Sequence, residues 1–270
     1  MPFLDRYAQA FARTGSRLCV GLDTDLAMLP AIVQEADNPM LLFNQAIVGA
    51  TADLAIAYKP NLAFYEAAGQ RGMDALKETL AVIPPHVIKI ADAKRGDIGN
   101  TAERYAQAFL ETLPFDAITV NPYMGTDTLK PYFKYEGTCK FVLALTSNPG
   151  SHEFQRIESA GKPMYLHVID RCLDAFGSTG DLGFVVGATH PEELAQIREH
   201  VGPDIPLLIP GVGAQGGDAA AVIAANNRGA AFINVSRGII AASKGDDFAA
   251  AARAAALKFA EELRDEVPAT

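Results

Sequence analysis

The 270-residue chain has few cysteines and no excess of basic charge, and both shortages exclude classes of protein. Its three cysteines, Cys19, Cys139 and Cys172, are odd in number and far apart, which fits neither a disulfide framework nor a zinc site. With 23 Lys and Arg against 32 Asp and Glu, the net charge of −9 argues against nucleic acid or an anionic membrane as partner. No apolar run approaches the ~20 residues of a membrane span, and Asp5 and Arg6 interrupt any signal peptide. We therefore expect a cytoplasmic protein.

The chain does contain a regular alternation of short apolar runs and helical patterns. Near-continuous apolar runs are typical of a parallel sheet covered by helices on its faces. The eight runs are Leu18–Asp23, Ala55–Asn61, Val87–Lys94, Ala117–Tyr123, Lys140–Thr146, Gly183–Thr189, Pro206–Gly213 and Ala230–Arg237. Each repeat has about 34 residues, enough for a βαβ unit, and no linker divides the chain. We predict a single (β/α)₈ TIM barrel over residues 1–270 with an extra N-terminal helix; a doubly wound open sheet is the alternative.

Several helices have recognisable starting residues. Asn100 followed by Glu103, and Thr189 followed by Glu192, both have the spacing of a capping box. A last helix is predicted over Asp247–Leu263. These helices would cover the outside of the barrel.

Charged residues stand at the ends of the predicted strands, where barrel enzymes place their chemistry. The first run ends in Asp23, the second contains Lys59, and the third ends in a charged segment with Asp92, Lys94 and, just beyond it, Asp97. Asp92 and Lys94 are two residues apart and share a strand face, and Lys59 on the neighbouring strand would lie about 5 Å away. Asp97, beyond Gly96, would be the fourth member of this cluster. Carboxylates between lysines keep the lysines protonated, which suits a proton donor. The alternatives are a salt-bridged surface loop and, for Lys59, a structural ion pair.

A phosphate site is predicted in the loops after the seventh and eighth runs. These loops contain Gly211-Val-Gly-Ala-Gln215-Gly216 and Arg237, and barrels often bind phosphate at this place. Glycine amides can approach a dianion closely, and an arginine can bind it through two charge-assisted hydrogen bonds. The same glycines match the dinucleotide fingerprint, but no acidic residue follows about twenty positions later, which argues against an oxidoreductase.

The segment Asp92-Ala-Lys-Arg-Gly-Asp-Ile-Gly-Asn-Thr101 closely resembles the signature of the orotidine 5′-phosphate decarboxylase family, in its longer bacterial subgroup. The resemblance covers the whole barrel, from Gly21 to Gly238. It implies a cofactor-independent and metal-independent decarboxylation of orotidine 5′-phosphate to UMP, the final step of de novo pyrimidine nucleotide biosynthesis.

The resemblance also implies a role for each residue of the site. Lys94 would give a proton to C6 of the pyrimidine, and Asp92 would lie against the departing carboxylate. Lys59 would pair with the aspartates and contact the ribose, and Asp23 would bind a ribose hydroxyl. Ser147 would contact the pyrimidine, although an ordinary turn serine explains it as well. The irregular segment 147–161 that Ser147 opens is a candidate lid or binding loop.

The resemblance further implies a homodimer in which Asp97, with Ile98 and Thr101, reaches into the neighbouring subunit's site. A related magnesium-dependent phosphosugar decarboxylase or aldolase, which shares the Asp-x-Lys-x-x-Asp motif, is the main alternative, and a non-catalytic phosphate-binding protein is another. The five histidines show no metal-ligand spacing, so we expect no metal site.

Overall fold

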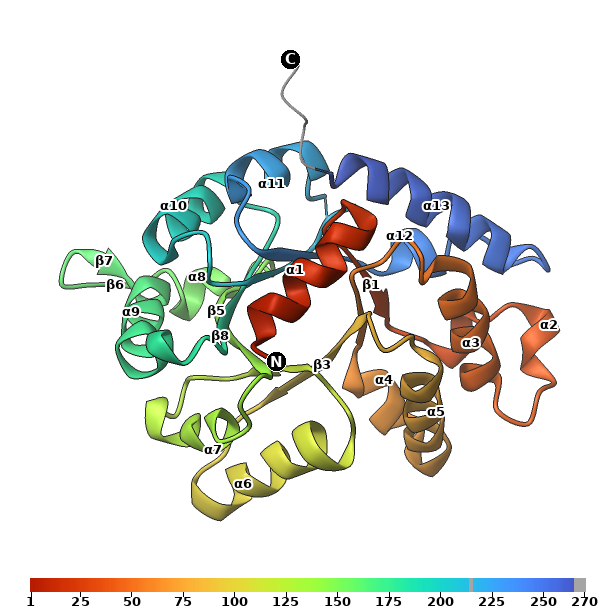
Figure 1. Ribbon diagram of the computed structural model, residues 1–270, viewed down its shortest axis with the longest axis horizontal. Helices are drawn as coiled ribbons and strands as arrows, with labels where there is room; N and C mark the ends of the chain where they lie inside the picture. The colour runs from red at the N-terminus through yellow and green to blue at the C-terminus, as the bar shows by residue number, and fades with distance from the viewer. Residues whose placement is uncertain (214–215, 265–270) are drawn as a thin grey trace.

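The structure, a computed structural model, describes residues 1–213 and 216–264, and these include eight parallel strands that close into a barrel (Figure 1). In spatial order the strands are β1 (Leu18–Leu22), β2 (Ala57–Pro60), β3 (Ile88–Arg95), β4 (Ala117–Val120), β5 (Cys139–Leu145), β8 (Leu182–Val186), β9 (Leu207–Pro210) and β10 (Ala231–Val235). Each of the eight predicted runs corresponds to one strand. Because β10 pairs with β1, the sheet has no edge, which confirms the barrel and excludes the open sheet.

Helices connect the strands and form a ring around the barrel (Figure 1). In the described part of the chain the longer ones are α3 (Pro39–Thr51), α5 (Gly69–Val82), α6 (Gly99–Gln107), α9 (Met164–Phe176), α10 (Pro191–Val201), α11 (Ala219–Asn226) and α13 (Phe248–Glu262). Shorter ones are α2 (Ala31–Gln34), α4 (Leu62–Ala67), α7 (Lys130–Phe133) and α12 (Arg237–Ile240), and α6 continues as a π-helical turn, η2 (Ala108–Thr112). The last of the ring, α13, confirms the helix predicted there. Within the described residues no helix has the length and apolarity needed to cross a membrane.

The expected extra helix, α1 (Phe3–Thr14), lies across one mouth of the barrel (Figure 1). Its Phe3 ring packs 6.4 Å from the Phe141 ring and 6.0 Å from the Phe232 ring, and the Tyr7 ring lies 5.2 Å from Phe232. These partners belong to the apolar cluster that fills the inside of the barrel. The helix therefore closes this end with aromatic side chains, and the opposite mouth is left for a site.

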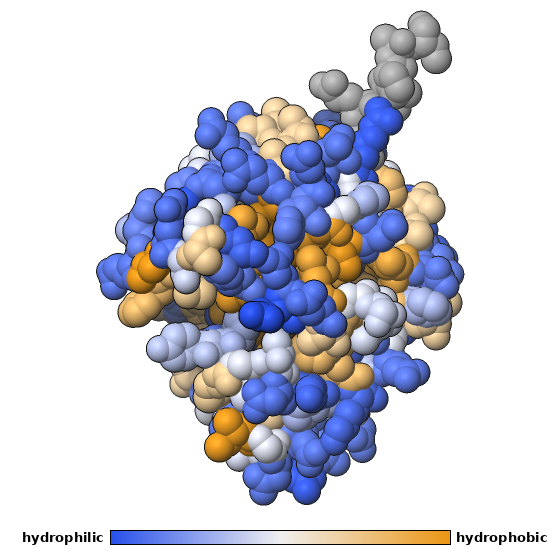
Figure 2. Space-filling model, turned by 90° about the vertical axis from the view of Figure 1, so that its left-hand side faces the viewer, coloured by the Kyte–Doolittle hydropathy of each residue, from blue (hydrophilic) through white to orange (hydrophobic). Residues whose placement is uncertain are grey.

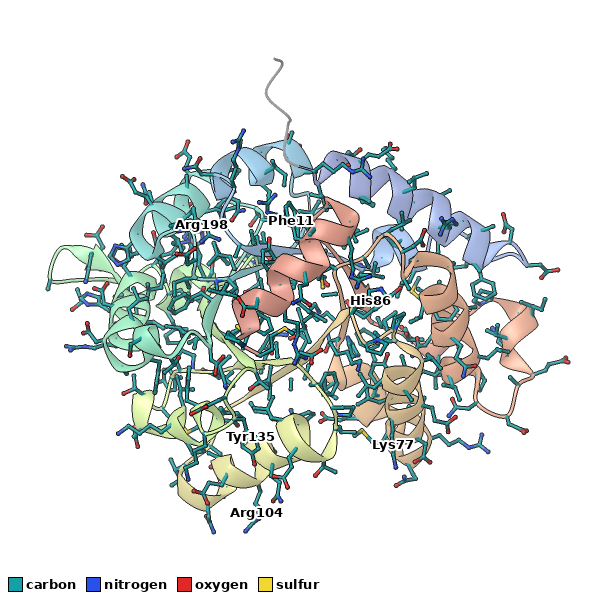
Figure 3. The ribbon with its side chains drawn as sticks, viewed as in Figure 1. Phe11, Lys77, His86, Arg104, Tyr135 and Arg198 are labelled. Atoms are coloured by element: carbon teal, nitrogen blue, oxygen red, sulfur yellow. The ribbon has the colours of Figure 1, made fainter. Side chains whose placement is uncertain are left out.

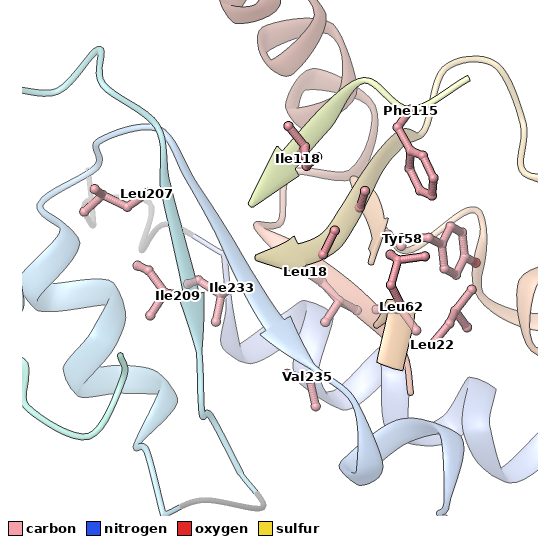
Figure 4. Packing of buried hydrophobic residues seen from close by; sticks show 14 of the residues in the cluster. Leu18, Leu22, Tyr58, Leu62, Phe115, Ile118, Leu207, Ile209, Ile233 and Val235 are labelled. Carbon is pink, nitrogen blue, oxygen red and sulfur yellow. The ribbon is translucent and has the colours of Figure 1, made fainter. Parts of the chain in front are cut away.

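Strand residues alternate between two apolar clusters, as the period of two in a strand requires. Leu18, Leu22 and Tyr58 point outward and pack beneath the helices (Figure 4), whereas Cys19 and Phe232 point into the barrel. The interior is filled by side chains rather than open. A polar residue at an inward position of a strand is therefore conspicuous.

A buried lysine stabilises the N-terminal end of β5, away from the open mouth. The Lys140 side chain is fully buried, and its Nζ donates 2.6 Å hydrogen bonds to the carbonyl oxygens of Tyr135, labelled in Figure 3, and Thr138. Asp181 lies 3.6 Å from the same Nζ. Burial lowers the pKa of Lys140 to about 8, and the nearby Asp181 carboxylate offsets only part of this shift.

Two predicted helix caps are wrong, each by one or two residues. α6 begins after Ile98, so Asn100 lies inside its first turn and makes no cap. α10 begins after His190, and Thr189 lies one residue too early to cap it. The proline at the first position of α10 disfavours a helical conformation for the residue before it, and His190, at φ −134° and ψ 79°, is not helical, so the helix starts past the capping-box position.

The segment after β5, predicted to be irregular, contains local structure. A short helix, α8 (Ser151–Phe154), is followed by a hairpin of β6 (Glu158–Ser159) and β7 (Lys162–Pro163). The side of the molecule on which this hairpin lies is largely hydrophilic, with separate apolar areas (Figure 2). Phe154 is 65% exposed, so this segment presents an apolar side chain to solvent near the mouth of the barrel.

Candidate active site

A cavity of about 300 Å³ opens at the C-terminal ends of the strands, opposite α1. Seven of the residues predicted for the site line it: Asp23, Lys59, Asp92, Lys94, Ser147, Gly211 and Arg237. They come from segments throughout the chain, from the end of β1 to the start of α12. Closure of the barrel brings them together, because all eight parallel strands end at this mouth.

Four charged side chains alternate in sign across the floor of this cavity. Lys94 Nζ lies 2.5 Å from Asp92 Oδ1, and Lys59 Nζ lies 2.8 Å from Asp92 Oδ2. Lys59 Nζ is also 3.9 Å from Asp23 Oδ1. Asp97 was predicted as the fourth member of this cluster; within one chain the fourth member is instead Asp23, because β1 pairs directly with β2 and brings Asp23 to Lys59.

Burial and pairing set the protonation of the two inner members. Burial disfavours charge on Lys59, yet the Asp92 and Asp23 carboxylates outweigh it and hold the pKa of Lys59 above its ordinary value. Burial likewise works against charge on Asp92, but Lys59 and Lys94 keep its pKa well below the usual range. The pair is therefore ionised at neutral pH. Lys94 differs from Lys59 because half of its side chain is exposed to the cavity, where a ligand can reach it.

Beneath the charges lies Cys19, which points into the barrel from β1. Its Sγ donates a hydrogen bond of 3.7 Å to Asn234 Oδ1. Burial raises the pKa of Cys19 to about 12, so it remains a neutral thiol and is no candidate nucleophile.

The same cavity is also lined by Gly211 and Arg237. Gly211 has φ +109°, a conformation that favours glycine, and this lets the chain turn away from β9 beside the cavity. Arg237 is exposed there, and among the described residues no carboxylate forms an ion pair with it. Gly216 does not line the cavity, and Gln215 lies outside the described residues. An exposed arginine at the cavity is suited to binding a phosphate dianion, whereas the amides of Gly213, Gly216 and Gly217 donate to carbonyls within their own loop.

Asp97, Ile98 and Thr101 do not line the cavity of their own chain. Ile98 is 63% exposed, and Asp97 Oδ1 accepts a hydrogen bond of 2.8 Å from the Ile98 amide. The signature loop therefore points its apolar residue away from the site of the same chain.

Six polar residues that line the cavity were not predicted as site residues: Thr146, Asn148 and Ser236 in loops, and Asn61, Thr119 and Asn234 on strands or directly after one. Thr119 and Asn234 each occupy an inward position of an otherwise apolar strand, and Asn61 follows Lys59 by two residues on the same face. A polar side chain at an inward strand position is the signal that would have found these three, whereas the three loop residues carry no such signal. Among the described residues no group of His, Cys, Asp and Glu could hold a metal ion.

Comparison with known proteins gives consistent similarities over almost the whole chain. A family model described as "Orotidine 5′-phosphate decarboxylase / HUMPS family" matches residues 16–255. Relatives named orotidine 5′-phosphate decarboxylase from Herpetosiphon aurantiacus and Ralstonia pickettii are each 46% identical, covering 95% and 97% of this chain and 96% and 98% of the relatives. The structure of Leishmania donovani OMP decarboxylase is 35% identical with a TM-score of 0.83 and covers 97% of both chains. The matched region contains every strand of the barrel.

Proposed function

Because the chain belongs to the orotidine 5′-phosphate decarboxylase / HUMPS family, we propose that it converts orotidine 5′-phosphate to UMP and carbon dioxide, the final step of de novo pyrimidine nucleotide biosynthesis. The reaction makes it a carboxy-lyase, EC 4.1.1.23. The chemical observation that carries the proposal is the alternating cluster of Lys94, Asp92 and Lys59 in a cavity that Arg237 also lines.

Lys94 is the proposed proton donor. The bond between C6 and the carboxylate breaks, carbon dioxide leaves, and the electron pair stays on C6. The ammonium of Lys94 then gives one proton to C6 and recovers it from solvent. A fixed positive charge at the carbon where negative charge develops stabilises the transition state without a cofactor, which is the effect that dominates many enzymes. The 2.5 Å contact with Asp92 holds this ammonium in place before substrate binds.

Asp92 has a second proposed effect, on the substrate itself. Its carboxylate would lie beside the carboxylate that departs, and two like charges about 4 Å apart repel by about 4 kcal/mol at an effective dielectric of 20. Relief of that repulsion as carbon dioxide leaves corresponds to nearly three powers of ten in rate. We place this contribution second to stabilisation of the carbanion, because Asp92 is already neutralised by two lysines.

The remaining residues bind the two ends of the nucleotide. Asp23 and Lys59, 3.9 Å apart, are proposed to bind the ribose hydroxyls. Arg237 and the glycines from Gly211 onward are proposed to bind the phosphate, with Gln215 and Gly216 contributing from the same loop. Ser147 also lines the cavity and is proposed to contact the pyrimidine.

We further propose that the active enzyme is a homodimer whose sites are shared between chains. Asp97, Ile98 and Thr101 stand outside the cavity of their own chain, and the exposure of Ile98 supports a role in contacting a second copy. The test mixes two inactive variants, Lys94→Ala and Asp97→Ala, after separate purification and subunit exchange. If the sites are shared, each mixed dimer contains one intact site, and activity returns to about a quarter of the wild-type value for random exchange. Dimers that exchange without any recovery would show that each site is built from one chain.

The proposed reaction is tested by the loss of orotidine 5′-phosphate absorbance with purified protein in EDTA, beside the Lys94→Ala variant. We expect rapid conversion to UMP by the wild type and none by the variant, while the variant still binds UMP. Failure of folded wild-type protein to turn over the substrate would reject the assignment. Activity that appears only with magnesium and a sugar phosphate would instead favour the related phosphosugar enzymes.

A further inference from the structure

The strand that carries Asp92 and Lys94 departs from regular pairing at these residues. Ala91 on β3 is paired with Ile118 on β4, and the next pair along is Arg95 with Val120. Three residues of β3 therefore stand opposite a single residue of β4, Thr119. A bulge of this kind leaves amide groups without their ladder partners and re-aims the side chains of the bulged strand.

The side chain of Thr119 replaces the backbone hydrogen bonds that β3 and β4 do not form at the bulge. Its Oγ1 accepts hydrogen bonds from the amides of Ala93 at 3.0 Å and Lys94 at 2.8 Å. The same hydroxyl donates to Asp92 Oδ1 at 3.2 Å. All the hydrogen-bonding capacity of a hydroxyl, one donor and two acceptors, is thus used on three consecutive residues of β3. Thr119 is 1% exposed, so water cannot easily replace it.

Two further hydrogen bonds, at residues that follow Asp92 on β3, also stabilise the bulge. Arg95 Nη1 donates a hydrogen bond of 3.0 Å to the Ala93 carbonyl, and the Asn121 amide donates one of 2.8 Å to the Arg95 carbonyl, which resumes the ladder. The backbone of Lys94 is held between these bonds at φ +46°, a conformation that side chains other than glycine rarely adopt. Among the hydrogen bonds at the bulge, the one to Thr119 Oγ1 is the bond that the Lys94 amide itself donates.

We propose that Thr119 is a positioning residue for the decarboxylation: its hydroxyl holds the left-handed backbone of Lys94 and one oxygen of Asp92, so that the ammonium faces the cavity in the reactive geometry. This inference rests on the proposed function. It assigns Thr119 no contact with the reacting atoms; the residue acts through Lys94 and Asp92. An ordinary buried threonine would affect stability alone, whereas a positioning residue changes the rate of the reacting complex.

The test compares Thr119→Val, which keeps the volume but removes the hydroxyl, with Thr119→Ser, which keeps the hydroxyl. Thr51→Val is the matched control, because Thr51 is also fully buried and its hydroxyl bonds Tyr58 and the Ile47 carbonyl outside the cavity. Rates are measured per folded enzyme, with kcat and KM determined separately. We expect Thr119→Val to lower kcat by about 10- to 100-fold, the loss that a small displacement of a catalytic group causes, and to leave KM nearly unchanged. Thr119→Ser should recover most of kcat, and Thr51→Val should keep it.

Two results would overturn the inference while leaving the proposed function intact. One is an active wild type whose Thr119→Val variant has an unchanged kcat. The other is an equal loss in the Ser and Val variants, which would show that the hydroxyl is not what matters. If Thr119→Val does not fold, Thr119→Cys replaces it, since a thiol is of similar size and a weaker hydrogen-bonding group, and the same criteria apply. An inactive wild type would reject the proposed function itself.

Discussion

The backbone of Lys94 offers a direct test of whether the site stores strain. A residue other than glycine in the left-handed region costs about 1–2 kcal/mol, and Lys94 has φ +46°. Replacing Lys94 by alanine removes the ammonium and keeps this strain, whereas replacing it by glycine removes both. The loss of the ion pair with Asp92 is common to both variants and cancels in the comparison.

The magnitude follows from two opposing effects. Relative to alanine, glycine stabilises the folded protein by about 1–2 kcal/mol because the backbone strain is absent, and destabilises it by about 0.5–1 kcal/mol because the unfolded chain has greater freedom. Lys94→Gly should therefore be more stable than Lys94→Ala by about 0.7 kcal/mol, or about 2 °C in Tm for a chain of this size. Neither variant should decarboxylate orotidine 5′-phosphate, because both lack the proton donor.

The assay is urea and thermal unfolding of both variants, followed by circular dichroism in the same buffer. The matched control is the same pair of substitutions at Lys89, which lies on the same strand with ordinary extended backbone. There the order should reverse, with glycine the less stable by about 0.5–1 kcal/mol. An alanine variant at position 94 as stable as the glycine variant would refute the argument that this backbone is strained.

Three further predictions concern charged groups. Arg237→Ala should weaken UMP binding by about 10- to 100-fold, since hydrogen bonds to charged groups contribute about 1.5–3 kcal/mol, while the binding of uridine, measured by calorimetry in parallel, should not change. Asp92→Asn should lower the free energy of unfolding by about 3 kcal/mol at pH 7, because it leaves Lys59 buried with only Asp23 at 3.9 Å. Because the pKa of Asp92 is lowered in the folded state, this advantage of the wild type should be complete above about pH 4 and should shrink progressively as pH falls below it; an advantage that stays undiminished in acid would contradict the prediction. The pKa of Lys140 is about 8 when folded, so between pH 8 and about 10.5 the unfolded chain holds the extra proton, and the wild type should gain up to about 3 kcal/mol over Lys140→Met as pH rises. If the difference in the free energy of unfolding between wild type and variant, measured by urea titration, stays constant across that pH range, the pKa of Lys140 is not lowered in the folded protein.

Much of the barrel could be predicted from local pattern. The eight apolar runs became the eight strands because a parallel sheet buried on both faces needs continuous apolar segments, and that requirement is met within each run. Helix starts were predicted less well. Asn100 and Thr189 have the right side chains for caps, but the turn entering each helix, not the cap residue, decided where the helix begins.

The charged members of the site could also be anticipated, since Asp92 and Lys94 follow an apolar strand directly at the end where barrels place their sites. The precise arrangement of Asp92 and Lys94 could not be anticipated from the sequence. A regular strand would have put Asp92 and Lys94 on one face through simple alternation, whereas the structure reaches the same contact through a bulge and a left-handed Lys94.

What the sequence by itself determined is therefore the set of strands and the residue types at their ends, because both depend on hydrophobicity and periodicity along the chain. What only the tertiary structure decided is which residues of different strands touch. Asp23 reaches Lys59, and Thr119 reaches the bulge beside Lys94, only because closure of the barrel sets the register between β1 and β2 and between β3 and β4. Register is a property of the whole closed sheet, and no single strand contains it.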